Sequence, residues 1–361
     1  MSEESNVKSR LNSKHVILPI CLGFIGIGYL FYSEFSAIID GSMDISALFT
    51  PKTILFLFLA LCCVAMHDLA GMRRLHLLSD GIIGFWGTFR VRMLYEFTNA
   101  ATPTAMGGST LEMLFIYKEG VKFGDSTAIC IISLFFDELF FVLSFPVLLL
   151  MLSYNDLFVI DGAAQAGILS FFLIGYICKL VWVIILFIGI FVKPFAISWL
   201  IVQVCRIPFL RSKRTAALRT AVDIKECSRR MRHKSLKFWI QMIVHSFLLA
   251  ISRFLVVNML ILAFTDATFL SLYDHLIVVG RQIITMVIMM IAPTPGGSGF
   301  IEVLFETYLG GYVPKGMVLV LVVLGWRLLT YYYYLVMGAV IAPRWVNQHF
   351  PRKAKKQVQE I

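Results

Sequence analysis

Charge is scarce in this sequence. Only 15% of its 361 residues are Asp, Glu, Lys or Arg, whereas 59% are hydrophobic. A soluble chain carries about 25% charged residues, so the composition excludes an ordinary soluble domain. Several apolar runs exceed the roughly 18 residues that mark a membrane-spanning helix. A closed β-barrel is excluded as well, because barrels show short alternating segments and no long apolar runs. We therefore predict an all-α polytopic membrane protein.

Motifs for cofactor chemistry are also missing. The seven cysteines form no CxxC pair and fall mostly inside apolar runs, which is typical of small core residues and not of disulfides or metal ligands. No metal-ligand spacing and no nucleotide-binding loop is present in the sequence. We expect no metal, no cofactor and no catalytic residues, and we predict that the protein is not an enzyme.

Six apolar stretches are long enough to cross a membrane. They are Val16–Ile39, Thr53–Gly71, Thr127–Leu152, Ala164–Val192, Phe238–Phe264 and Lys315–Ala342. The first is interpreted as a retained span, because it exceeds the apolar core of a signal peptide, about 7–15 residues, and no small-residue cleavage site follows it.

Positive charge gathers in a loop at 206–237 and in a second cluster, Arg344–Lys356. Short basic loops stay in the cytoplasm, so we predict a multi-pass protein of the cell's inner membrane with both termini cytoplasmic. The basic loop serves either as a topology signal alone or as a contact for anionic lipid headgroups. A nucleic-acid partner is not expected. A homo-oligomer and a cytoplasmic partner at the basic loop remain open.

These features predict three regions. They are a cytoplasmic segment at 1–15, a transmembrane domain at 16–342 and a basic cytoplasmic tail at 343–361. Within the domain, we expect one repeat at about 16–152 and a second at about 164–342.

Two regions contain glycine-rich motifs between short apolar arms. Gly81–Tyr117 contains TPTAMGGSTLE, and Leu276–Leu309 contains PTPGGSGFIE. The arms that follow the glycines, Thr110–Tyr117 and Phe300–Leu309, cover about half of a ~30 Å hydrocarbon core at ~1.5 Å per residue. We therefore predict two re-entrant helical hairpins whose tips lie within the membrane.

The two motifs also match each other in Pro-Thr, Gly-Gly-Ser, Glu and Leu-Phe, with gaps that differ by one residue. The predicted topology places the hairpins in opposite orientations, since the first has its ends inside and the second has its ends outside. Each half then contains two spans, a hairpin and a span. This pattern indicates an inverted-topology repeat, which in transporters places the binding site between the repeats near mid-membrane.

Candidate substrate-binding residues lie in the hairpins and among the ionisable side chains of the apolar runs. Free N–H groups at the start of the second helix of each hairpin favour a phosphate, and ionisable residues inside a membrane are functional candidates by default. The candidates are Arg90, Glu96, Asn99, Pro103, Thr104, Gly107, Gly108, Ser109, Glu112, Asp137, Glu138, Arg281, Pro293, Thr294, Pro295, Gly296, Gly297, Ser298, Glu302 and Arg327.

Two interpretations stay open for the hairpin glutamates. Glu112, three residues after Ser109, fits a capping box, and Glu302 fits a looser equivalent. The alternative is that these carboxylates bind a headgroup or a proton. For the other intramembrane charges, which include Arg92, Lys179 and Arg253, an ion pair is as good an explanation as substrate contact.

PTPGGSGFIE, followed by WRLLTYYYYLVMG from Trp326, resembles the flippase-like transmembrane family, which includes the membrane region of lysylphosphatidylglycerol synthase and the YbhN-type proteins. The first hairpin, with Asn99, Pro103 and Glu112, is more loosely similar to the family's N-terminal signature. That signature usually has an arginine beside the glycines, where this chain has Ala105-Met106. The resemblance implies lipid translocation without a soluble aminoacyl-transferase domain.

Three hypotheses follow. In the first, a flippase moves an anionic or phosphate-bearing lipid, such as a phospholipid, a modified phospholipid or a polyprenyl phosphate, between the hairpin tips. In the second, buried carboxylates serve as general bases of a lipid-modifying transferase. In the third, the basic loop of an accessory subunit recruits a cytoplasmic partner.

Overall fold

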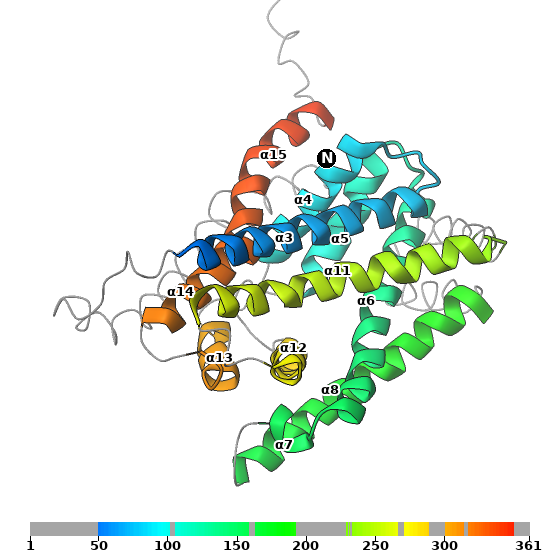
Figure 1. Ribbon diagram of the computed structural model, residues 1–361. Helices are drawn as coiled ribbons and strands as arrows, with labels where there is room; N and C mark the ends of the chain where they lie inside the picture. The colour runs from blue at the N-terminus through cyan, green and yellow to red at the C-terminus, as the bar shows by residue number, and fades with distance from the viewer. Residues whose placement is uncertain are drawn as a thin grey trace, which may run out of the picture.

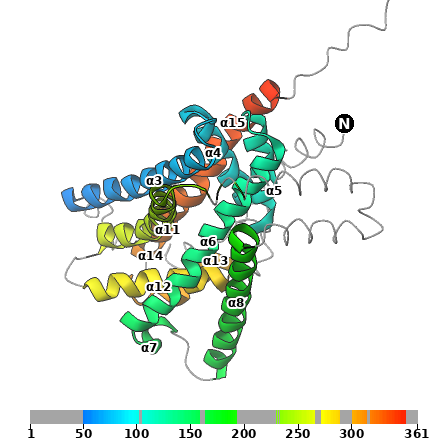
Figure 2. The same cartoon turned by 90° about the vertical axis from the view of Figure 1, so that its right-hand side faces the viewer.

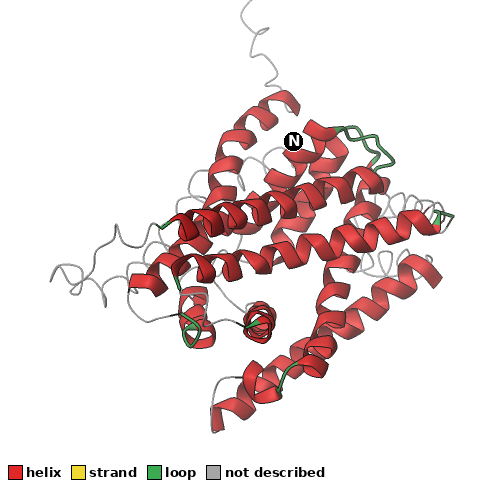
Figure 3. Cartoon of the chain, viewed as in Figure 1, coloured by secondary structure: helices red, strands yellow, loops and turns green. Residues whose placement is uncertain are grey.

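The computed structural model describes residues 50–101, 105–158, 163–192, 233–265, 271–288, 300–313 and 317–349, with residues 229 and 231 (Figure 1). Every regular element in these ranges is a helix (Figure 3). The predicted first span, Val16–Ile39, lies outside them, as do most of the basic loop and most of the tail.

The helices are named in chain order with their bounds. They are α3 (Pro51–Leu78), α4 (Phe85–Ala101), α5 (Ala105–Lys118), α6 (Phe123–Met151), α7 (Tyr154–Leu157), α8 (Ala163–Phe187), the π-helical turn η2 (Ile188–Val192), α11 (Leu236–Phe264), α12 (Leu272–Ile288), α13 (Phe300–Leu309), α14 (Met317–Arg327), the π-helical turn η7 (Leu328–Tyr332) and α15 (Tyr333–His349).

Five helices are long and apolar enough to cross a membrane. They are Pro51–Leu78, Phe123–Met151, Phe172–Val192, Leu236–Phe264 and Val318–His349. Their surfaces carry large exposed apolar side chains, such as Phe58 on α3 and Leu150 on α6, as expected for contact with lipid. The predicted all-α class is confirmed for the described residues, and five of the six predicted spans overlap these candidate membrane-spanning helices. The second span is longer than predicted, because α3 continues to Leu78.

Helices α3 and α11 lie side by side and antiparallel at the centre of the bundle (Figure 1). The Thr53 hydroxyl donates to the carbonyl of Ala263 over 3.0 Å at one end of the pair. Further along, His67 Nδ1 lies 2.7 Å from the carbonyl of Leu249. Both helices are capped at their N-termini by a side-chain oxygen. The Thr50 hydroxyl accepts a hydrogen bond from the Thr53 amide, and the Ser235 hydroxyl accepts one from the Phe238 amide. The turned view shows α8 beside α6 at the edge of the bundle (Figure 2).

The arms of both predicted hairpins are helical and pack against each other, α4 with α5 and α12 with α13. The second arms have 14 and 10 residues. At ~1.5 Å per residue these lengths are about 21 and 15 Å, short of a ~30 Å core. The tips, residues 102–104 and 289–299, lie outside the described ranges, so their depth stays a prediction.

One local interpretation of the first hairpin is wrong. Helix α5 begins at Ala105, so Gly107, Gly108 and Ser109 are already helical. Ser109 therefore does not cap the helix start, and a capping box does not explain Glu112. Helix α15 packs closely on α4, because a Cβ atom on Gly338 would lie 2.1 Å from Phe97 Cγ.

Candidate functional site

The apolar core is divided into two clusters, and polar side chains lie between them. Along α6, Phe136 belongs to the first cluster and Phe140 to the second. Asp137 and Glu138 lie between these two residues, near the middle of the 29-residue helix. The same change from apolar to polar and back occurs along α3 and α11. A band of charge therefore crosses the interior of the bundle.

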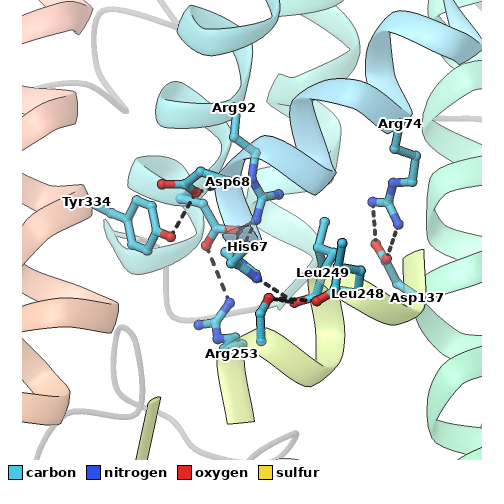
Figure 4. Close-up of polar contacts among 11 residues, drawn as sticks. His67, Asp68, Arg74, Arg92, Asp137, Leu248, Leu249, Arg253 and Tyr334 are labelled. Carbon is cyan, nitrogen blue, oxygen red and sulfur yellow. Dashed lines mark hydrogen bonds and ion pairs between the residues drawn. The ribbon is translucent and has the colours of Figure 1, made fainter. Parts of the chain in front are cut away.

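We call this band the polar layer, and Figure 4 shows the part of it that includes His67, Arg92 and Asp137. The polar layer consists of ten side chains from six helices: His67, Asp68 and Arg74 on α3, Arg92 and Glu96 on α4, Asp137 and Glu138 on α6, Lys179 on α8, Arg253 on α11 and Tyr334 on α15.

Glu96 and Arg92 form the central ion pair of the polar layer. They are four residues apart on α4, and Arg92 Nη2 lies 2.6 Å from Glu96 Oε1. Their side chains are only 7% and 6% exposed. The other carboxylate oxygen of Glu96 lies 3.5 Å from Arg253 Nη1, so α11 shares this carboxylate with α4. Arg92 Nε lies 3.7 Å from Asp68 Oδ1, and this contact adds α3 to the group.

His67 and Tyr334 complete this group. Arg92 Nη2 lies 2.6 Å from His67 Nε2, and a guanidinium nitrogen can only donate. His67 Nε2 must then accept, and the proton of the neutral ring sits on Nδ1, which donates to the Leu249 carbonyl. The Tyr334 hydroxyl donates to Asp68 over 2.9 Å. Each ionised group is thereby supplied with a partner.

Two further pairs tie α6 to its neighbours. Asp137 accepts hydrogen bonds from both terminal nitrogens of Arg74, and the Nη2–Oδ2 distance is 3.1 Å. Arg74 lies on α3 and is buried. Glu138 lies 2.5 Å from Lys179 Nζ on α8. The Lys179 ammonium also lies 4.9 Å from the centre of the Phe141 ring. The two adjacent carboxylates of α6 therefore bind to different helices.

Formal charge in the polar layer sums to zero. Arg74 and Lys179 are matched by Asp137 and Glu138, while Arg92 and Arg253 are matched by Asp68 and Glu96. Such matching is necessary because each unpaired charge at the bilayer centre costs roughly 2.5–3.5 kcal/mol on insertion scales. Within the described ranges, no group of three or more His, Cys, Asp or Glu side chains is placed to hold a metal ion.

A glycine allows Arg92 to reach α3. A Cβ atom on Gly71 would lie 2.9 Å from Arg92 Nε and 3.1 Å from Leu249 Cδ1. Contacts this short are not sustained between real atoms, so a larger residue at position 71 would push Arg92 away from Asp68. The absence of a side chain at Gly71 thus leaves the space that Arg92 occupies beside α3.

Arg253 differs from the other cations of the polar layer in its exposure. Its side chain is 38% exposed, whereas that of Arg92 is 7% exposed. Arg253, His67 and Tyr334 line a small cavity of about 10 Å³, together with Leu329 and Thr330 of the π-helical turn η7. This volume is about what one water molecule needs.

The structure brings three predicted site residues, Glu96, Asp137 and Glu138, into the polar layer. Two others lie elsewhere: Arg90 pairs with Glu119 at 2.7 Å, and Arg281 donates to the carbonyls of Asp156 and Tyr308. Both arginines stabilise connections between helices and are not part of the layer.

Three more predicted residues take no part in the ion pairs described above. Arg327 is buried with its guanidinium 4.6 Å from the centre of the Tyr331 ring. Asn99 has a buried Oδ1 with no hydrogen-bond partner in the described part of the chain. Glu112 faces α6, where the thiol of Cys130 is its partner.

The remaining candidates belong to the hairpin tips or to the first turns of α5 and α13. Pro103, Thr104, Pro293, Thr294, Pro295, Gly296, Gly297 and Ser298 lie outside the described ranges. The structure describes Gly107 and Gly108 only as part of helix α5, and it does not describe the side chains of Ser109 and Glu302. Their roles in binding stay predictions.

Sequence reasoning missed His67, Asp68, Arg74 and Tyr334. A signal existed for the first two, because His67-Asp68 interrupts the apolar run Thr53–Gly71. Arg74 follows His67 by seven residues, two helical turns further along, and so lies on the same face of α3. That spacing indicates one polar stripe and not a cytoplasmic loop.

Comparisons with known proteins agree with a membrane role. A family model described as the lysylphosphatidylglycerol synthase TM region matches residues 17–338. A UPF0104 membrane protein from Archaeoglobus fulgidus is 24% identical over 278 residues, which are 74% of this chain and 79% of that protein. No solved structure matches this chain.

Proposed function

The chain belongs to the family of the lysylphosphatidylglycerol synthase transmembrane region, and we propose that it moves a lipid with an anionic or phosphate-bearing headgroup from one leaflet to the other. The observation that carries this proposal is the polar layer. Phospholipids, modified phospholipids and polyprenyl phosphates all present the chemistry that its arginines bind.

A headgroup that crosses a bilayer needs polar partners at the depth where lipid tails offer none. The polar layer supplies them inside the bundle, because Arg92 and Glu96 pair there while their side chains stay nearly inaccessible. A structural helix pair gains little from so many buried charges, since well-packed apolar residues often stabilise a core equally well. Binding of a charged substrate would account for these buried charges.

The lengths and packing of the helices support an inverted repeat. Helices α3 and α11 have 28 and 29 residues, and α4 and α12 have 17 each. In each half, the long helix packs on the first arm of the following hairpin, and α3 and α11 are antiparallel. Under this proposal, one repeat rocks against the other about the polar layer.

Arg253 is the residue that we propose meets the headgroup. It is the more exposed partner of Glu96, at 3.5 Å. If a phosphate displaced Glu96 from Arg253, the carboxylate would still keep Arg92 at 2.6 Å. No buried charge would then be left alone. The exchange therefore avoids the 3–5 kcal/mol that breaking a buried pair commonly costs.

The described cavity beside Arg253, of about 10 Å³, is too small for a headgroup, and under this proposal it widens during transport. We propose that opening occurs at η7, whose Leu329 and Thr330 line the cavity. A π-helical turn lacks the regular hydrogen-bond spacing of an α-helix and is frequently found at functional sites. Movement of α15 relative to α14 would enlarge the space next to Arg253.

The test is lipid movement by purified protein in liposomes. Fluorescent phosphatidylglycerol, polyprenyl phosphate and phosphatidylcholine are each placed in one leaflet, and their transfer is followed with a membrane-impermeant quencher. We expect at least one of the two anionic lipids to cross faster than in protein-free liposomes. The variant Arg344→Gln is a matched control, because Arg344 is exposed and lies on α15 outside the polar layer.

Three outcomes would reject the proposal. The first is that no anionic lipid crosses faster with protein than without it. The second is formation of a new lipid product from a supplied donor, which would favour the transferase. The third is that deletion of 211–237 abolishes capture of a cytoplasmic partner while no lipid movement is found in either protein, which would favour an accessory subunit.

A further inference from the structure

A second concave surface lies on the outer face of α3, away from the polar layer. It is a groove of about 780 Å³ bounded by α3, the start of α4 and the middle of α11. Its walls are apolar over most of their length, with Cys62, Ala65 and Leu69 along α3. Nothing in the proposed transport step uses this surface.

One end of the groove is basic. Arg73, His76 and His245 line it there, and no Asp or Glu belongs to its described lining. Arg73 is exposed and forms no ion pair with a described residue, in contrast to its neighbour Arg74, which is buried against Asp137. The groove therefore presents an uncompensated positive charge.

The two histidines are oriented to offer one ring nitrogen each. His76 Nδ1 lies 2.9 Å from the carbonyl of Ile83, and His245 Nδ1 lies 2.6 Å from the carbonyl of Gln241. A carbonyl oxygen only accepts, so both Nδ1 atoms carry protons. The Nε2 atom of each ring is left for a ligand. The Arg73 guanidinium can donate to a phosphate oxygen, and each imidazole can donate through Nε2 only when that atom also carries a proton.

The dimensions fit one leaflet of a membrane. Cys62 and Arg73 are eleven residues apart on α3, a distance of about 16 Å along the helix. Half of a ~30 Å hydrocarbon core is about 15 Å. Arg73 follows the end of the apolar run at Gly71, and the loop charges predict that this end of α3 is cytoplasmic. The basic end thus lies toward the predicted cytoplasmic end of α3, and Cys62 lies about 16 Å further into the bundle along the helix.

We propose that this groove binds one phosphate-bearing anionic lipid of the cytoplasmic leaflet. The phosphate lies among Arg73, His76 and His245, and an acyl chain extends along α3 toward Cys62. This inference deepens the proposed function, because it names the place where substrate docks before it reaches the polar layer. It is tested by binding, so its failure is distinguishable from a failure of transport.

Charge argues against the chain's own first span as the occupant. In the predicted orientation, the cytoplasmic end of Val16–Ile39 is preceded by Lys8, Arg10 and Lys14. These cations would face Arg73 and repel it, whereas an anionic headgroup is attracted. The groove is therefore assigned to lipid.

The experiment uses Cys62 as a reporter inside the groove and Cys178 as an internal reference. Both thiols are exposed, and Cys178 lies on α8, far along the chain from the groove lining. Purified, delipidated full-length protein in detergent is alkylated with a membrane-permeant maleimide in the presence of phosphatidylglycerol or phosphatidylcholine. Peptide mass spectrometry measures both rates, and fragment spectra distinguish Cys62 from the buried Cys63.

We expect phosphatidylglycerol to slow alkylation of Cys62 at least fivefold relative to Cys178, and phosphatidylcholine to have less than half that effect. The double variant Arg73→Gln/His245→Gln should lose the protection, while Arg344→Gln should keep it. Ala65→Trp should also lose it, because the indole fills the apolar part of the groove. Leu61→Trp is the matched control, since Leu61 is exposed on α3 but does not line the groove.

Several results would overturn the proposal. Equal protection by the two lipids would show that the headgroup is not recognised. Protection that persists in Arg73→Gln/His245→Gln would remove the basic end from the site. Protection of Cys62 by inorganic phosphate alone would exclude an acyl chain as its cause. A Cys62 thiol that is unreactive without lipid, or that cross-links to residues 16–39, would identify the first span as the occupant.

Discussion

The ion pair between Arg92 and Glu96 allows the strongest quantitative test of the polar layer. Two unit charges about 4 Å apart attract by about 4 kcal/mol at an effective dielectric constant of 20. Removing one partner of a buried pair costs about 3–5 kcal/mol. Here the lower end applies, because Glu96 retains Arg253 at 3.5 Å when Arg92 is lost. We therefore expect Arg92→Met and Glu96→Gln each to lower the free energy of unfolding by about 3 kcal/mol.

The double variant separates a specific pair from general damage to the core. If the two side chains act as a pair, Arg92→Met/Glu96→Gln should cost about 3–4 kcal/mol, well below the additive sum of about 6. The coupling energy is then about 2–3 kcal/mol, near the upper end for residues in contact. Equilibrium unfolding in mixed micelles, followed by tryptophan fluorescence at increasing SDS mole fraction, measures all four free energies.

An exposed pair provides the control for this cycle. Lys234 and Asp80 also form an ion pair, but their side chains are 26% and 50% exposed. Screening by water should reduce their coupling to at most about 1 kcal/mol, so Lys234→Gln and Asp80→Asn should be nearly additive. Additive costs for Arg92→Met and Glu96→Gln, or equal coupling in both cycles, would refute the assignment of a buried, mutually dependent polar layer.

Two further substitutions test the packing and charge around this pair. Gly338→Ala places a methyl group 2.1 Å from the ring of Phe97 and should lower the free energy of unfolding by about 1–3 kcal/mol; Gly84→Ala, with open space around it, should change it by less than about 0.5 kcal/mol. Asp137→Asn leaves buried Arg74 without its bidentate partner and should cost about 3–5 kcal/mol in the same SDS titration. A change below about 1 kcal/mol in either Gly338→Ala or Asp137→Asn would contradict the packing described here.

The positions of the spans could be predicted from sequence because apolar runs report on contact with lipid, which is local information. Leu236–Phe264 and Phe123–Met151 were predicted to within a few residues at each end. The bounds of α3 were harder, since Arg73 and Arg74 follow the apolar run and charged residues there usually belong to a loop. The helix continues because Arg74 forms an ion pair inside the protein with Asp137, which is 63 residues away in the chain.

The partners within the polar layer could not be predicted, because they join helices far apart in the chain. Glu96 was a candidate from its position in a hairpin arm, but its contact with Arg253 depends on how α4 crosses α11. Tyr334 belongs to a run of four tyrosines, Tyr331–Tyr334, of which three are buried. Only the fold shows that one of these hydroxyls bonds to Asp68.

The proposed transport requires a headgroup to pass through the polar layer by contact with Arg253. Transbilayer movement of fluorescent phosphatidylglycerol and polyprenyl phosphate in proteoliposomes should be compared between the wild type, Arg253→Gln and Arg344→Gln, at equal amounts of folded protein. Arg253→Gln should slow the transported lipid at least tenfold, while Arg344→Gln should leave its rate unchanged. Movement at the wild-type rate in folded Arg253→Gln would contradict the proposal.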